Sequence, residues 1–123
     1  MTTYDPNNIF AKILRGEIPC SKVYEDDYAL AFNDITPKAP VHVLVIPKNA
    51  YVSLTEFSQA ATPDEIAGFF RAVGNIVEKL GVAEDGYRTI ANTGLNGGQE
   101  VPHFHLHILA DHAIGPMVSK IED

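Results

Sequence analysis

The sequence predicts a single α+β domain, with two helices packed on a five-stranded antiparallel sheet. The chain has 123 residues, 46% hydrophobic and 20% charged, which is ordinary for one globular domain. Five short runs of β-branched and aromatic residues are bounded by turn residues, and two segments carry helical spacing with helix end signals. Because these elements do not alternate strictly as βαβ units, an antiparallel sheet is favoured over a parallel one.

Two segments have the apolar spacing of a helix. Residues 7–15 follow a cap and a proline at Asp5-Pro6 and are stopped by a glycine. Residues 63–80 begin with the capping-box pattern Thr62-Pro63-Asp64-Glu65 and end before Gly81. Core packing alone explains the apolar stripe of this second helix.

The first four expected strands are β-forming runs that end at Asp, Asn or Pro, and the fifth starts at Pro102, since proline is tolerated at the start of a strand. The run that begins at Val41 is apolar enough to be a central strand covered on both faces. The first two runs are separated by Asp26-Asp27 and predict a hairpin. The expected strands are residues 22–25, 28–32, 41–46, 87–91 and 102–109.

Charge and cysteine content exclude several classes of partner. The formal net charge of −7 repels polyanions, and the nine Lys and Arg residues are scattered, so we expect no nucleic-acid partner. Cys20 is the only cysteine, which excludes an intramolecular disulfide and a Cys-rich zinc site and suits a reducing compartment. No signal-peptide pattern and no apolar run of roughly 20 residues is present, so we expect a cytoplasmic protein without membrane contact.

Four of the five histidines fall in two of the expected strands. His42 lies in the third strand, and His103, His105 and His107 alternate in the last one. Because strand side chains alternate between faces, these three rings share one face, while the apolar residues between them share the other. Packing alone is a poor explanation for three titratable rings on one face, so the pattern indicates a catalytic or ligand-binding role.

Metal binding is the alternative to catalysis by these histidines. His-x-His on a strand is a usual zinc ligand pair, and His42 could supply a third ligand. The rings of His103 and His107 start roughly 13 Å apart at about 3.3 Å per residue, so His103, His105 and His107 cannot all reach one ion. A zinc site made by His42 and two of these three histidines stays open at this point, without an evident carboxylate or thiolate companion.

A glycine-rich loop, residues 92–100, leads directly into the histidine strand. Glycines let main-chain N–H groups approach an anion closely, although Asn-Gly-Gly is also common turn chemistry. Beside three aligned histidines, this loop is a candidate phosphate cradle.

The segment Gly97-Gly98-Gln99-Glu100-Val101-Pro102-His103-Phe104-His105-Leu106-His107-Ile108 resembles the signature of the histidine triad (HIT) family. Upstream segments resemble the branch of purine nucleoside phosphoramidases, often called Hint proteins, in matching order and spacing from about residue 8 to 109. These upstream segments are residues 9–13, 24–27, 31–35 and 39–48. The resemblance implies one HIT domain over residues 1–123. It also implies a homodimer with a continuous ten-stranded sheet, whose C-terminal tail, about residues 110–123, takes part in the dimer and lies near the site.

The resemblance implies catalytic roles for the four clustered histidines. His105 would attack the α-phosphorus and form a nucleotidyl-histidine intermediate that water resolves. Its other ring nitrogen would donate a hydrogen bond to the main-chain carbonyl of His103. His107 would contact the phosphate and stabilise charge on its oxygens, and His42 and His103 would pack behind the nucleophile.

The resemblance also implies nucleotide-binding residues. Asp34 matches a carboxylate that accepts hydrogen bonds from the ribose hydroxyls, with Ile35 beside it, although Asp34 alone also suits a turn. The remaining matches are the apolar wall around the purine, Ile9, Phe10, Ile13 and Phe32, and the loop around the phosphate, Asn92, Gly98, Gln99 and Glu100.

The implied reaction is hydrolysis of adenosine 5′-phosphoramidates or related adenylates such as aminoacyl-AMP, with purine nucleotides (AMP or GMP derivatives) as substrates and no metal or other cofactor. The alternatives are a nucleotide-binding interaction protein with weak catalysis and a His-ligated zinc protein. Dinucleoside polyphosphate hydrolases of the family are less favoured, because the N-terminal half resembles Hint proteins. Two departures bear on the leaving group: Glu100 replaces the serine of animal members, and Ala110-Asp111-His112 replaces the common Gly-Gly-Arg.

Overall fold

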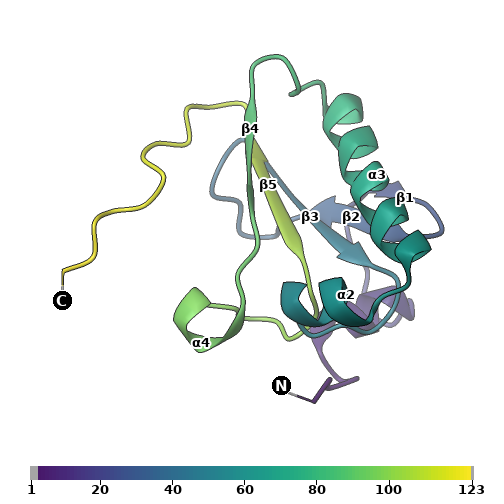
Figure 1. Ribbon diagram of the computed structural model, residues 1–123. Coiled ribbons are helices and arrows are strands. Elements are labelled where there is room, and N and C mark those ends of the chain that lie inside the picture. Colours follow the sequence, from purple (N-terminus) through teal and green to yellow (C-terminus); the bar gives the residue numbers. More distant parts are fainter. Residues whose placement is uncertain (1–2, 123) are drawn as a thin grey trace.

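The computed structural model describes residues 3–122, in which one antiparallel sheet has the strand order β1-β2-β3-β5-β4 (Figure 1). The central strand, β3, pairs with β2 on one side and with β5 on the other, and β1 and β4 form the two edges. The α+β class and the antiparallel sheet are therefore confirmed. The strands are β1 Lys22–Glu25, β2 Ala29–Asn33, β3 Val41–Pro47, β4 Tyr87–Ile90 and β5 Leu106–Ala110.

Four helices accompany the sheet in residues 3–122, where the sequence predicted two. The expected helices are α1, Ile9–Leu14, and α3, Pro63–Leu80. The additional ones are α2, Leu54–Ala60, and the single turn α4, Gly94–Gly97, which lies in the segment expected to be a loop. Within this described part of the chain, no helix has the length and apolar character needed to cross a bilayer.

The ends of α3 follow the predicted signals. The Thr62 hydroxyl accepts a hydrogen bond from the Glu65 N–H, and the Glu65 carboxylate accepts one from the Thr62 N–H. Gly81 then adopts a left-handed conformation with φ of 71°, which ends the helix at low steric cost. A similar pattern starts α2, where the Ser53 hydroxyl accepts from the Glu56 N–H. This Ser-x-x-Glu signal is present in the sequence and could have revealed α2.

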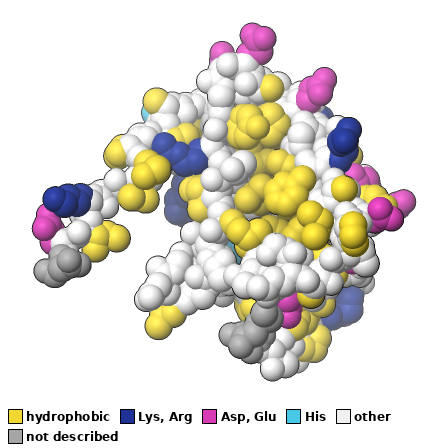
Figure 2. Space-filling view, in the orientation of Figure 1, with side chains coloured by type: hydrophobic (Ala, Val, Ile, Leu, Met, Phe, Trp, Pro, Cys, Tyr) yellow, Lys and Arg dark blue, Asp and Glu magenta, His cyan; other side chains and the backbone are white. Residues whose placement is uncertain are grey.

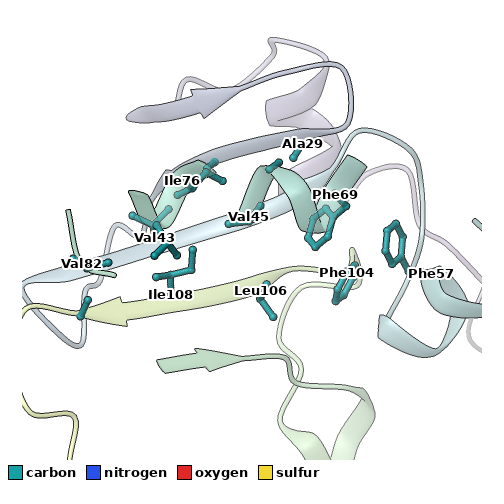
Figure 3. Close-up of a cluster of buried hydrophobic side chains, with 14 residues drawn as sticks. Ala29, Val43, Val45, Phe57, Phe69, Ile76, Val82, Phe104, Leu106 and Ile108 are labelled. Carbon is teal, nitrogen blue, oxygen red and sulfur yellow. The ribbon is translucent and has the colours of Figure 1, made fainter. Parts of the chain in front are cut away.

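The two faces of the sheet have separate apolar clusters. On one face α3 packs over β3, where Phe69 and Ile76 lie in one apolar cluster with Val43 and Val45 (Figure 3). The second cluster lies on the other face, next to α1, and consists of Phe10, Leu30, Phe32, Leu44 and Ile46. Consecutive residues of β3 alternate between these two clusters. Since α3 covers one face of the sheet, the face next to α1 is available for a site.

The strand expected over residues 102–109 is wrong at its start, because β5 begins at Leu106. Pro102 lacks an N–H group, and the N–H groups that follow bond outside the sheet. The His103 N–H donates to the Val101 carbonyl at 2.9 Å, and the Phe104 N–H donates to the Tyr51 carbonyl at 2.7 Å. His103 and His105 therefore lie in an irregular segment just before the strand, while His107 lies in it. The other strand ends differ from expectation by one residue at most.

Candidate active site

A pocket of about 560 Å³ opens on the α1 face of the sheet. Its walls come from α1, β2, β3, the loop before β5 and β5 itself. His107 pairs with Leu44 of β3, so its side chain projects on this face, and the apolar residues between the histidines project into the α3 cluster. The expected residues that line the pocket are Ile9, Phe10, Ile13, Phe32, Asp34, Ile35, His42, Asn92, Gly98, Glu100, His105 and His107.

Two expected residues, His103 and Gln99, do not line the pocket. His103 is fully buried behind it, and the Gln99 side chain bonds to the main chain of Val52, Gly94 and Val101. The pocket also contains residues that the sequence did not indicate, including Lys38 and the segment 18–21 between α1 and β1. This segment carries no motif, and its Ser21 carbonyl accepts from the Asn33 N–H at 3.0 Å, which holds it beside the end of β2.

The tautomer of His105 is fixed by its main-chain partner. Its Nδ1 lies 2.7 Å from the main-chain oxygen of His103, and a carbonyl oxygen only accepts, so Nδ1 carries the proton. The lone pair therefore lies on Nε2, in the ring that lines the pocket. Burial lowers the pKa of His105, opposed in part by its hydrogen bond to His103 and by the charges of Asp34 and Glu100. His105 is thus a neutral imidazole with a free Nε2 at pH 7.

His103 uses both of its ring nitrogens within the protein. Its Nε2 lies 3.1 Å from the Pro47 carbonyl and must donate to it, so Nδ1 accepts from the Tyr4 hydroxyl at 2.8 Å. Burial lowers the pKa of His103 to about 4, which keeps the ring neutral. With no nitrogen free for a ligand, the ring anchors the main-chain oxygen that holds His105.

His42 and His107 belong to a chain of hydrogen bonds that begins at the main-chain N–H group of Lys38. The Lys38 N–H donates to His42 Nδ1 at 3.0 Å, which places the His42 proton on Nε2. That atom lies 3.0 Å from His107 Nδ1, which must therefore accept and leave the His107 proton on Nε2. Burial lowers the pKa of His107 to about 4, and the electrostatic effect of the neighbouring His105 and His42 rings acts in the same direction. His107 is thus a neutral N–H donor in the wall of the pocket.

Asp34 serves a turn and also faces the pocket. One carboxylate oxygen accepts from the Thr36 N–H at 2.8 Å, and the other lies 3.4 Å from His42 Nε2. Asp34, His42 and His107 offer three potential metal ligand atoms within 4.8 Å of one another. The carboxylate companion that the sequence did not reveal is therefore present.

The hydrogen bonds of His42 nevertheless disfavour a cation in this cluster. A metal on His42 Nε2 would need the ring proton on Nδ1. There it would face the Lys38 N–H, so two donors would oppose each other at a distance of 3.0 Å between the nitrogens. The donor set alone resembles a metal site, but the tautomer that the main chain imposes on His42 does not suit one.

Comparisons with known proteins identify the family to which the chain is similar. A family model described as HIT domain matches residues 15–114. A HIT-like protein of Azospirillum brasilense is 59% identical over 96% of this chain and 97% of its own length. The purine nucleoside phosphoramidase of Escherichia coli K12 is 44% identical over 90% of this chain and 92% of its own length.

Solved structures of the same family are similar in fold. A histidine triad protein from Clostridium difficile has a TM-score of 0.79 and 42% identity, covering 98% of this chain and all of its own. A HIT family hydrolase from Clostridium thermocellum has a TM-score of 0.83 and 39% identity, covering 92% of this chain and 97% of its own.

Proposed function

Since this chain belongs to the HIT domain family, we propose that it hydrolyses adenosine 5′-phosphoramidates or related adenylates such as aminoacyl-AMP. The family and the phosphoramidase relative support a nucleotide hydrolase as the general class. The observation that carries the specific proposal is the His105 tautomer, with Nδ1 donating to the His103 carbonyl and Nε2 left free. An imidazole held in this way is preorganised as a nucleophile.

The proposed reaction proceeds in two displacements at phosphorus. His105 Nε2 attacks the α-phosphorus, and the bond to the leaving amine breaks with its electron pair passing to the amine, which takes up a proton. Water then attacks the phosphorus of the nucleotidyl-histidine and the phosphorus–nitrogen bond to His105 breaks, which releases AMP and restores the neutral ring. The Nε2–H of His107 stabilises the negative charge on the phosphate oxygens in both steps.

The walls of the pocket suit the three parts of a purine nucleotide. Apolar side chains offer a slot for the base, Asp34 offers a carboxylate to the ribose hydroxyls, and Glu100 offers a main-chain N–H group to the phosphate beside Gly98. The slot is formed by Ile9, Phe10, Ile13 and Phe32.

The active form is proposed to be a homodimer with a continuous ten-stranded sheet. The edge strand β4 leaves main-chain groups free to pair with a second copy. Hydrophobic side chains gather beside it, over the face between β4 and α3 (Figure 2). Both elements carry an exposed aromatic side chain, Tyr87 of β4 at 45% and Phe70 of α3 at 48% exposure. The C-terminal tail, about residues 110–123, would reach the partner's site, although Asp123 lies outside the described residues. Sedimentation equilibrium is expected to give twice the chain mass, and a Phe70→Glu variant is expected to sediment as a monomer.

Steady-state hydrolysis of an adenosine 5′-phosphoramidate tests the proposed function. Turnover is expected to survive a chelator and to disappear in His105→Ala, while that variant still binds AMP. Turnover that is lost on chelation would instead support the zinc alternative. Binding of AMP by the unaltered protein without any turnover would support a nucleotide-binding interaction protein.

A further inference from the structure

The Gln99 side chain joins three main-chain segments around the active site. Its Oε1 accepts from the Gly94 N–H at 3.1 Å. Its Nε2 donates to the Val52 carbonyl at 2.6 Å and to the Val101 carbonyl at 3.0 Å. The partners fix the orientation of the amide, because the N–H group only donates and the two carbonyls only accept.

These bonds leave the Gln99 side chain no donor for a ligand. A glutamine amide has two N–H donors, and both are used within the protein. Because the side chain does not line the pocket, it does not act as the nucleotide contact that the family resemblance implied.

The segment that Gln99 holds is rich in glycine and therefore flexible in the absence of other contacts. The loop between Gly94 and Glu100 contains three glycines, and Gly94 and Gly98 adopt left-handed conformations with φ of 67° and 75°. Glycine-rich segments lose much conformational freedom on ordering and need external contacts to stay in one arrangement. The Gln99 main chain adds a bond to the same point, since its N–H donates to the Gly94 carbonyl at 3.0 Å.

The same bonds connect the loop to the histidine segment. Val52 is buried next to the start of α2, and its neighbour Tyr51 accepts the Phe104 N–H at 2.7 Å. Residues 51–52 therefore hold the loop through Gln99 and hold the segment between His103 and His105 through Phe104. Residues 51–52 thus fix both the glycine-rich loop and the segment that carries His105.

We propose that Gln99 is a positioning residue that sets the main-chain N–H group of its neighbour Glu100 against His105 Nε2. Within residues 3–122 the N–H groups of Gly98 and Gln99 donate to carbonyls of the same loop, and no partner in the protein takes the Glu100 N–H. This inference rests on the proposed function, because the Glu100 N–H would meet a phosphate. Charge on the phosphate oxygens increases during attack, so a misplaced N–H group weakens the binding of the transition state and of the phosphate while leaving the purine and ribose contacts intact.

Near-isosteric variants test this role. Gln99→Glu places a carboxylate against two carbonyl oxygens, and Gln99→Met keeps the length of the side chain without any hydrogen bond. Gln59→Glu is the matched control, because it makes the same chemical change at an exposed position of α2, outside the loop. Both Gln99 variants are expected to lower kcat by ~10-fold to ~100-fold and to weaken AMP binding, while adenosine, which lacks the phosphate, binds as in the unaltered protein. Gln59→Glu is expected to behave as the unaltered protein does.

Hydrogen exchange provides a readout that does not depend on turnover. The Gly94 amide is expected to exchange faster in Gln99→Met, with no change at the amides of α3. The proposal is overturned if kcat is unchanged in Gln99→Met, or if AMP and adenosine affinities fall by the same factor in both variants. If the unaltered protein does not cleave phosphoramidates, the proposed function fails, and the comparison of AMP with adenosine still decides the role of Gln99.

Discussion

The Nδ1 atom of His105 lies 2.7 Å from the main-chain oxygen of His103, two residues earlier in the chain. This contact forms where the chain has not yet entered the regular ladder of β5, so the His103 carbonyl accepts a side-chain proton. Its consequence is that His105 carries its proton on Nδ1, whereas His42, His103 and His107 carry theirs on Nε2. His105, the proposed nucleophile, therefore differs from its neighbours in tautomer.

Nitrogen NMR of the imidazole rings tests this assignment without altering the site. At pH 7.5, His105 is expected to show a protonated Nδ1 and an unprotonated Nε2, and the other three rings are expected to show the reverse. Single His→Asn variants assign the signals, beginning with the exposed His112. A spectrum with His105 protonated on Nε2 would remove the basis for nucleophilic attack.

Stability is expected to fall as the pH drops from about 6.5 towards 4. Burial lowers the pKa of His103 to about 4, below its value of roughly 6.5 in an unfolded chain. At pH values above the pKa of the unfolded chain, the ring is neutral in both states and the protein has its full free energy of unfolding. Below it the unfolded chain takes up a proton that the folded protein excludes, which costs on the order of 3 kcal/mol for this ring at pH 4.

Urea denaturation at pH 7.5, 6.0 and 5.0 measures this loss before most carboxylates titrate. His103→Gln is expected to be less stable at pH 7.5 and to depend less on pH across the same range. Equal free energies of unfolding at pH 7.5 and 5.0 in the unaltered protein would show that the buried rings accept protons.

The ribose role of Asp34 can be separated from its role in the turn. The unaltered protein is expected to bind AMP at least ~10-fold more tightly than 2′,3′-dideoxy-AMP, because hydrogen bonds to a charged group contribute about 1.5–3 kcal/mol. Asp34→Asn is expected to abolish most of this difference, and the exposed Asp27→Asn control is expected to keep it. If Asp34→Asn weakens both ligands by the same factor, the carboxylate serves the turn alone.

Removal of the Tyr4 hydroxyl tests how His103 is anchored. In Tyr4→Phe the buried Nδ1 of His103 loses its donor, which is expected to cost about 1–3 kcal/mol in the free energy of unfolding and to lower kcat. Tyr28→Phe is the control, because the Tyr28 hydroxyl makes no hydrogen bond within residues 3–122. Thermal denaturation and turnover that match between the two variants would show that Tyr4 does not support the site.

The sequence predicted those parts of the fold that depend on local patterns. The capping box at Thr62, Gly81 and the period of the apolar stripe defined α3, and the alternation of His103, His105 and His107 with apolar residues identified the face of the site. The family resemblance supplied residues around the pocket that no local pattern would have grouped, such as Ile9 and Asp34.

The rest depends on contacts between distant segments. Pro102 and the bond from Phe104 to Tyr51 delay the start of β5, and a β pattern alone does not show where a ladder begins. The proton positions on the histidines depend on Tyr4, Lys38 and Pro47, which lie far from the triad in the sequence. The role of Gln99 also depends on a distant contact, because its partner Val52 is 47 positions away in the sequence.

The central claim is that His105 becomes covalently nucleotidylated during turnover. Mass spectrometry of the intact protein, quenched shortly after mixing with an adenosine 5′-phosphoramidate, tests it most directly, with peptide mapping to locate any adduct. The account predicts a transient gain of one adenylate on His105 that persists with a chelator present and is absent in His105→Ala. Turnover by the unaltered protein without any adduct, or an adduct that remains in His105→Ala, would contradict it.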